Sequence, residues 1–195
     1  MLYNNLPVFF VDIVEDYEGV DTISLVDTPA VESNYIMYAD DSKNSALLKY
    51  SLFGDRQILN GVAMIPDFPI IRTLPDGTQC YHIFKREAIE RIVEKYFADR
   101  NSTSVNLNHF EDVKGCVVFE SYLINREKGI LPKAFEDYPD GTWIISMKIN
   151  DADLWKEIKE GKYNGFSVEG YLHYCDKPKE ETISTLKQLF DYLNN

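Results

Sequence analysis

The 195-residue chain contains 45% hydrophobic and 13% aromatic residues, so it has enough apolar material for one folded domain with a sizeable core. Its formal net charge of −12 disfavours binding to the phosphates of nucleic acids. No stretch approaches the ~18 consecutive apolar residues of a membrane-spanning helix, and the first residues lack the features of a secretory signal. We therefore expect a cytoplasmic protein without nucleic-acid or membrane partners.

The first 50 residues predict short strands. Apolar runs rich in aromatic and β-branched residues favour extended structure, and turn-forming residues separate these runs. Asp27-Thr28-Pro29-Ala30 ends the second run, because proline removes a backbone donor from a strand. We interpret residues 1–50 as an N-terminal arm. Its predicted strands cover residues 6–14, 22–26 and 34–38.

Residues 51–176 contain the longest series of predicted elements, and we interpret them as the main domain. Pro75-Asp76-Gly77 is a strong turn signal between two apolar runs, which predicts an antiparallel hairpin. Over residues 85–97 apolar residues recur every three or four positions, which predicts an amphipathic helix. The predicted strands before this helix cover residues 45–52, 57–65, 70–74 and 80–84.

Two predicted strands after the helix carry candidate catalytic residues. Residues 104–110 alternate in polarity, and a period of two places His109 on the same face as Leu107. Residues 117–124 place the carboxylate of Glu120 in an apolar run, where it either has a partner or points to solvent at a sheet edge.

A serine between two glycines follows a short predicted helix. Asp151 can cap this helix at its start, and Gly161 can end it. Ser167 then lies near the start of a strand predicted over residues 166–174. The final segment, residues 177–195, has helical spacing and predicts a C-terminal helix that could pack against the domain or form a homodimer.

A serine hydroxyl becomes a useful nucleophile only when a base removes its proton, and imidazole is the usual base. The chain has three histidines, and His109 lies at the end of a predicted strand. The pairing of Ser167 with His109 is therefore a hypothesis that a structure can test. The three cysteines, in contrast, are far apart and predict neither a disulfide framework nor a CxxC zinc site, and we expect no metal and no cofactor.

Several short motifs occur in a fixed order along the chain. They are Gly61-Val62-Ala63-Met64-Ile65-Pro66, Asn108-His109, Val118-Phe119-Glu120-Ser121, Gly141-Thr142-Trp143, Met147-Lys148, Trp155, Gly161 and Gly165-Phe166-Ser167-Val168-Glu169-Gly170. This ordered set resembles the XkdF-like phage serine proteases, which are similar to the prohead, or capsid maturation, proteases of the herpesvirus assemblin type. The resemblance implies a mainly β, α+β fold in which helices flank a closed β-barrel.

The resemblance also implies a nucleophilic serine and a histidine base that come from different strands. Ser167 would attack the scissile carbonyl, and His109 would accept the hydroxyl proton and later protonate the leaving amine. Gly165 and Gly170 would allow a substrate backbone or an oxyanion to approach closely.

The group that orients the imidazole is left open. Assemblins use a second histidine, but His173 would lie roughly 20 Å from Ser167 along an extended strand. Glu120 is the preferred candidate, because a hairpin closed over residues 111–115 would bring its strand beside His109. The remaining alternatives are Asp112, Glu169 and a histidine.

The resulting prediction is a serine endopeptidase that cleaves scaffold and major capsid proteins during phage prohead maturation. It would act in the host cytoplasm, inside the assembling procapsid. Polar linkers at residues 39–44 and 176–179 add self-cleavage as a hypothesis. The alternative is a non-enzymatic virion or capsid-assembly protein that retains the protease fold.

Overall fold

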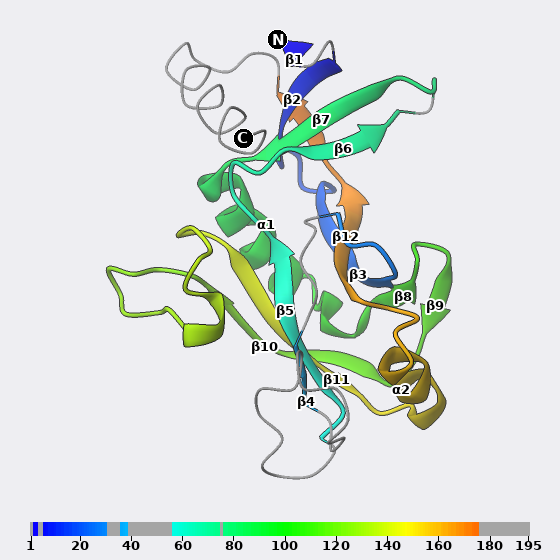
Figure 1. The fold of residues 1–195 in the computed structure, drawn as a ribbon. Helices are drawn as coiled ribbons and strands as arrows, with labels where there is room; N and C mark the ends of the chain where they lie inside the picture. Colours follow the sequence, from blue (N-terminus) through cyan, green and yellow to red (C-terminus); the bar gives the residue numbers. More distant parts are fainter. Residues whose placement is uncertain (1, 4–5, 31–35, 39–55, 75, 176–195) are drawn as a thin grey trace.

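The computed structural model describes residues 2–3, 6–30, 36–38, 56–74 and 76–175. Within these residues the chain is mainly β, with three sheets and two α-helices (Figure 1). The expected closed β-barrel is wrong, because none of the sheets in the described part of the chain closes on itself. Each sheet instead ends in edge strands, and the connections carry the chain from one sheet to another.

The first sheet has the strand order β1-β2-β7-β6, and β13 also pairs with β2. The pairing of β2 with β7 is parallel, and the other pairings are antiparallel. The predicted hairpin is confirmed as β6 and β7. The strands are β1 (Leu2–Tyr3), β2 (Leu6–Asp12), β6 (Ile70–Thr73), β7 (Gln79–Phe84) and β13 (His173–Cys175).

The second sheet has the order β10-β11-β5-β4 and is antiparallel throughout. Every residue of β5 is buried, as expected for a central strand covered on both faces. The strands are β4 (Ile36–Tyr38), β5 (Ile58–Met64), β10 (Cys116–Leu123) and β11 (Trp143–Ile149).

The third sheet has the order β12-β3-β8-β9 and carries the candidate active site. Strands β3 and β8 are parallel, and the two outer pairings are antiparallel. The strands are β3 (Gly19–Val26), β8 (Val105–Leu107), β9 (Glu111–Val113) and β12 (Gly165–Tyr171).

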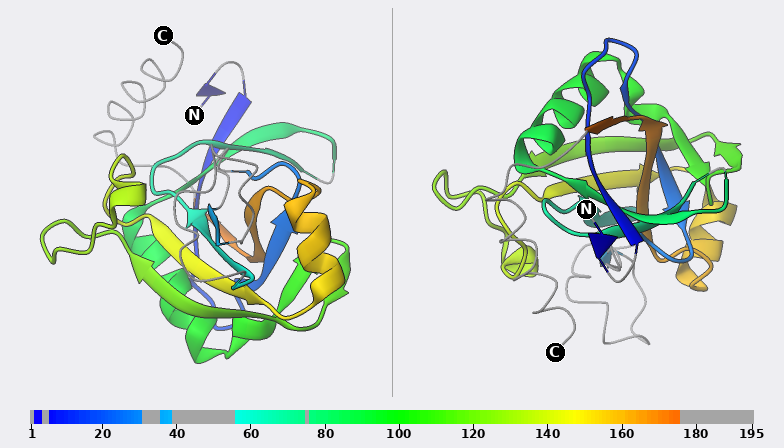
Figure 2. Two further views of the ribbon diagram at one scale, coloured as in Figure 1. Left: turned by 60° about the horizontal axis from the view of Figure 1, so that its bottom comes forward. Right: turned by 90° about the horizontal axis from the view of Figure 1, so that it is seen from above.

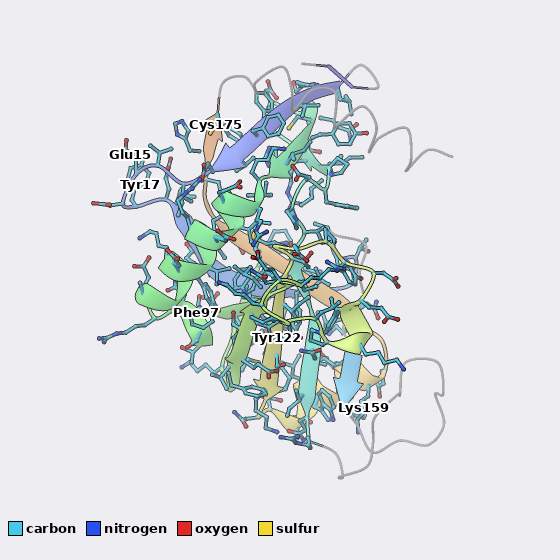
Figure 3. All side chains as sticks on the ribbon, turned by 90° about the vertical axis from the view of Figure 1, so that its left-hand side faces the viewer. Glu15, Tyr17, Phe97, Tyr122, Lys159 and Cys175 are labelled. Atoms are coloured by element: carbon cyan, nitrogen blue, oxygen red, sulfur yellow. The ribbon has the colours of Figure 1, made fainter. Side chains whose placement is uncertain are left out.

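Helix α1 (Arg86–Ala98) confirms the predicted amphipathic helix. Its apolar face is buried, and the ring of Tyr96 packs edge-on against Trp143 of β11 at 5.4 Å between centroids. Burial of each large side chain of this kind stabilises the fold by about 1.5–3 kcal/mol. In Figure 3 the turn marked by Glu15 and Tyr17 lies beside α1, where Arg91 binds Asp12 at the end of β2.

Helix α2 (Ala152–Lys159) leads into the strand of Ser167. As predicted, Asp151 caps it, and its Oδ1 accepts a hydrogen bond of 2.8 Å from the Leu154 backbone N–H. Gly161 ends it in the left-handed region with a φ of 82°, which a residue without a Cβ adopts at little cost. Figure 2 shows α1 and α2 on different sides of the sheets. Two 3-10 helices cover Asn101–Thr103 and Lys133–Phe135.

The segment expected as an N-terminal arm supplies strands to all three sheets. Val11 of β2 and Ile23 of β3 belong to the same buried cluster as Ile89 of α1 and Trp143 of β11. Part of residues 1–50 therefore shares its core with the main domain. The domain boundaries stay predictions, since residues 39–55 and 176–195 lie outside the described residues, as do the predicted strand at 45–52, both polar linkers and the C-terminal helix.

Candidate active site

A row of polar side chains crosses the third sheet. Ser167 of β12 pairs with Ser24 of β3, and Ser24 pairs in turn with Asn106 of β8. All three residues are buried. Residues directly opposite each other in an antiparallel pair have Cβ atoms about 5 Å apart, so the two serine side chains are neighbours. The apolar residues that alternate with them on each strand pack into the core.

His109 lies in the turn after β8 rather than in a strand. The strand ends at Leu107, and Asn108 and His109 both have left-handed backbone, with φ of 48° and 65°. The Phe110 N–H closes the turn with a 3.0 Å bond to the Leu107 carbonyl. Strand alternation therefore does not apply at His109, and the prediction that it shares the face of Leu107 is wrong.

The turn directs the imidazole to the polar row. His109 Nδ1 lies 2.9 Å from Ser24 Oγ and 3.3 Å from Glu169 Oε2. The same carboxylate oxygen accepts a 2.7 Å hydrogen bond from Asn106 Nδ2. An ionised carboxylate can only accept hydrogen bonds, so we assign the imidazole proton to Nδ1. The lone pair is then on Nε2, so Nε2 is the nitrogen that can accept a proton as a general base.

Ser167 has no direct hydrogen bond to His109. Its Oγ is buried and has no hydrogen-bond partner among the described residues. An unpaired buried hydroxyl costs about 1–3 kcal/mol, and a catalytic role is one explanation for such a group in a folded protein. Ser167 and His109 line one cavity of about 500 Å³, together with Arg72 and the chain after β3.

A family model described as "Putative phage serine protease XkdF" matches residues 47–175. The chain belongs to this XkdF family. No curated protein and no solved structure matches the chain significantly. The matched segment includes Ser167, His109 and Glu169 and excludes Ser24. The expected resemblance to the XkdF-like phage proteases is therefore confirmed.

Glu120 occupies a different sheet of this XkdF-family chain. It lies on β10, is exposed, and accepts a hydrogen bond from Ser146 Oγ of β11. The expected hairpin does not bring β10 beside His109, because β9 over residues 111–113 pairs with β8 whereas β10 pairs with β11. Glu169 is the carboxylate that the fold places at the imidazole.

Asp112, the other carboxylate left open by the sequence, lies on β9 opposite Asn106. It lines a cavity of about 490 Å³ that His109 and Glu169 also line. The hydrogen bonds to the imidazole, however, come from Ser24 and Glu169. Ser24 and Asn106 were not singled out from the sequence, although Thr22 and Ser24 alternate with apolar residues and so mark a polar face of β3.

Gly170 is required by backbone packing. A Cβ at this position would lie 1.9 Å from the carbonyl oxygen of Gly19, where the pairing of β12 with β3 shifts register. Gly165 is buried at the start of β12, opposite Val26. The expected roles of Gly165 and Gly170 toward a substrate or an oxyanion stay predictions.

The other two histidines of the XkdF-family chain lie in the first sheet. His173 is on β13, whose last residue Cys175 is labelled in Figure 3, and its Nδ1 lies 3.3 Å from Glu18 Oε1. His82 on β7 is buried, and burial lowers its pKa to about 4. Among the described residues, neither histidine is hydrogen-bonded to Ser167.

Two classes of feature are absent from the described part of the chain. It holds no group of three or more His, Cys, Asp or Glu side chains arranged to bind a metal ion. It also holds no helix long and apolar enough to span a membrane.

Proposed function

We propose that this XkdF-family chain is a serine endopeptidase that cleaves scaffold and major capsid proteins during phage prohead maturation. The observation that carries the proposal is the imidazole of His109, held through Nδ1 by Glu169 on the face that also carries Ser167. Glu169 replaces Glu120 as the proposed orienting carboxylate. The site of action would be the assembling procapsid in the host cytoplasm.

The proposed mechanism follows from the placement of the protons. His109 Nε2 removes the proton of Ser167 Oγ while that oxygen attacks the scissile carbonyl, and the resulting imidazolium later protonates the leaving amine. Glu169 stabilises the imidazolium through Nδ1–H, and Asn106 holds the carboxylate in position. Ser167 Oγ has no existing hydrogen bond to break before it binds Nε2.

Ser24 is a less suitable nucleophile although it is bonded to the imidazole. To take the proton of Ser24 through the observed contact, Nδ1 would have to carry the lone pair. That lone pair would then face the carboxylate of Glu169 at 3.3 Å, which is unfavourable between two acceptors. Ser24 is therefore proposed to position His109, with Ser167 as the nucleophile.

Covalent labelling tests this assignment. The full chain is treated with a fluorophosphonate probe, the labelled serine is located by mass spectrometry, and cleavage of co-expressed scaffold and capsid proteins is followed. We expect the label on Ser167 and loss of both labelling and cleavage in Ser167→Ala, whereas Ser24→Ala remains labelled. A label on Ser24, or full cleavage by Ser167→Ala, contradicts the assignment.

A non-enzymatic role in capsid assembly is the second candidate. The observation that favours it is the covered position of Ser167 Oγ without a bond to His109. Such a protein would be present at fixed stoichiometry in mature particles and would leave scaffold and capsid chains intact. Quantitative mass spectrometry of particles assembled with wild-type and Ser167→Ala chains separates the two functions, and the same spectra show whether residues 39–44 or 176–179 are cut.

A further inference from the structure

A second cavity of about 360 Å³ adjoins the candidate active site. His109 and Glu169 line part of it, and Arg72, His82 and Tyr174 line another part. Arg72 also lines the cavity that Ser167 lines, so one guanidinium borders both cavities. A substrate chain bound at Ser167 can therefore place a neighbouring side chain in the second cavity.

Arg72 is a half-buried cation without a bound carboxylate in the part of the chain that the structure describes. Three other described arginines are paired, in Arg86–Glu90, Arg91–Asp12 and Arg126–Asp140, whereas Arg56 and Arg100 are exposed to solvent. Burial lowers the pKa of Arg72, and the groups that oppose this effect are Tyr174 and Cys80. Thiol and phenol groups are uncharged at neutral pH, and burial raises the pKa of Cys80 further, so neither neutralises the guanidinium.

His82 supplies a second polar group without a partner. The residue is only 8% exposed, and its Nε2 has no hydrogen-bond partner among the described residues. The ring packs edge-on against Tyr174 at 5.0 Å between centroids. Because burial lowers the pKa of His82 to about 4, the imidazole is neutral at pH 7 and can donate one N–H. A guanidinium without a bound carboxylate and an imidazole with an unpaired ring nitrogen thus line one cavity of the described structure.

We propose that this cavity is a substrate subsite for the carboxylate of an Asp or Glu side chain close to the scissile bond, an inference that rests on the proposed protease function. Arg72 pairs with the carboxylate, for which a guanidinium has matching geometry, and the neutral His82 imidazole donates a second hydrogen bond from the ring nitrogen that carries its proton. Glu169 lies in the same cavity, but its Oε2 is occupied by Asn106 and His109. The acidic side chain therefore binds at the Arg72 and His82 end.

The test begins with the wild-type chain. A peptide library prepared from a digested proteome is incubated with the full chain and, as the blank, with Ser167→Ala, and cleavage sites are read by mass spectrometry. We expect Asp or Glu to be enriched at one position near the cleaved bond. A matched pair of fluorogenic peptides with Glu or Gln at that position should then differ at least about tenfold in kcat/KM.

Variants of Arg72 assign the preference to this cavity. Arg72→Gln should reduce the Glu-to-Gln ratio of kcat/KM to within about twofold by slowing only the Glu peptide, and Arg72→Lys should restore part of the ratio. Arg100→Gln, at an exposed arginine, is the matched control and should keep the ratio. The proposal is overturned by equal kcat/KM of the wild type on Glu and Gln peptides at every position, a result that needs no variant to fold. It is also overturned by an unchanged ratio in Arg72→Gln.

These outcomes separate the subsite from the protease assignment. Cleavage that depends on Ser167 but shows no acidic preference overturns the subsite and leaves the proposed function standing. Absence of any cleavage that depends on Ser167 overturns the proposed function, and the subsite with it.

Discussion

Two polar clusters on neighbouring sheets are built from the same residue types, a glutamate, a serine and an asparagine. The cluster on the second sheet consists of Glu120, Ser146 and Asn60. The cluster on the third sheet consists of Glu169, Ser24 and Asn106, with His109 added. In both, the serine and the asparagine are buried and the glutamate is not.

The clusters differ in whether a serine hydroxyl is left without an acceptor and whether an imidazole is present. On the second sheet Asn60 donates to Ser146, and Ser146 donates to Glu120, so the Ser146 hydroxyl proton already has an acceptor and no imidazole is present. On the third sheet an imidazole binds the carboxylate, and the neighbouring Ser167 keeps an unpaired hydroxyl beside a cavity. A buried serine that bonds to a carboxylate is therefore a structural feature. It becomes a candidate nucleophile only where an imidazole can accept its proton.

The largest expected effect comes from removing that imidazole. His109→Ala should lower kcat/KM by on the order of 10⁴, because members of a catalytic triad act as a unit. His173→Ala is the matched control, since His173 also contacts a glutamate, Glu18, but lies in the first sheet. Steady-state kinetics on one peptide substrate measures both variants, and comparable losses in the two would place the base elsewhere.

The second prediction compares the two glutamates directly. Glu169→Gln should lower kcat by roughly 10³, because an amide no longer favours the Nδ1–H tautomer of His109 or stabilises the imidazolium. Glu120→Gln should leave kcat within about twofold, since Glu120 binds Ser146 on the other sheet. The reverse ranking of the two variants would restore Glu120 as the orienting residue.

A third region, the buried His82 of the first sheet, should respond to acid. The folded pKa of His82, at about 4, lies below the ordinary value of 6.5, so the unfolded chain binds more protons than the folded chain between these values. Stability should therefore fall as the pH drops from 6.5 toward 4, with His82 contributing about 3 kcal/mol. Urea unfolding at several pH values should show a flatter acid limb for His82→Gln, and an unchanged limb would exclude this contribution.

A smaller effect is expected at Ser24. Ser24→Ala removes one of the two hydrogen bonds that hold Nδ1 of His109, while Glu169 keeps the other. We expect kcat to fall roughly fivefold with little change in KM, in line with about 1 kcal/mol for one hydrogen bond. A loss as large as that of Ser167→Ala would identify Ser24 as the nucleophile instead.

The smallest effect on catalysis is expected in the cluster without an imidazole. Ser146→Ala should leave kcat/KM within about twofold but reduce the free energy of unfolding by about 1–3 kcal/mol, because the buried Asn60 amide and Glu120 lose their shared partner. Denaturant unfolding and peptide cleavage, measured on the same preparation, separate the two quantities. A large loss of activity at unchanged stability would show that this cluster takes part in catalysis.

Local elements followed well from the sequence because short-range patterns specify them. Apolar spacing identified α1, and an Asp and a Gly at the two ends identified α2. The Pro-Asp-Gly turn identified the β6-β7 hairpin. Ser167 and His109 were also singled out from the sequence, and the structure places both at one cavity, whereas their catalytic roles stay predictions.

Short-range patterns did not predict which strands pair or which way the side chains of turn residues point. The hairpin expected to bring Glu120 to His109 assumed that successive strands pair, but β10 leaves the third sheet and joins β11. His109 departs from alternation because two successive residues adopt positive φ, which spacing does not reveal. Ser24 lies outside the family match and reaches the site only through the pairing of β3 with β12 and β8.

By itself the sequence determined the family, helices α1 and α2, the β6-β7 hairpin and two candidate catalytic residues, because short-range patterns of residue type specify each of these. The tertiary structure alone decided that the sheets stay open, that Glu169 rather than Glu120 meets the imidazole, and that Arg72 and His82 face a cavity beside it. The physical reason is that sheet order and register depend on long-range packing, and a change of partner or of one residue in register moves a side chain to another face.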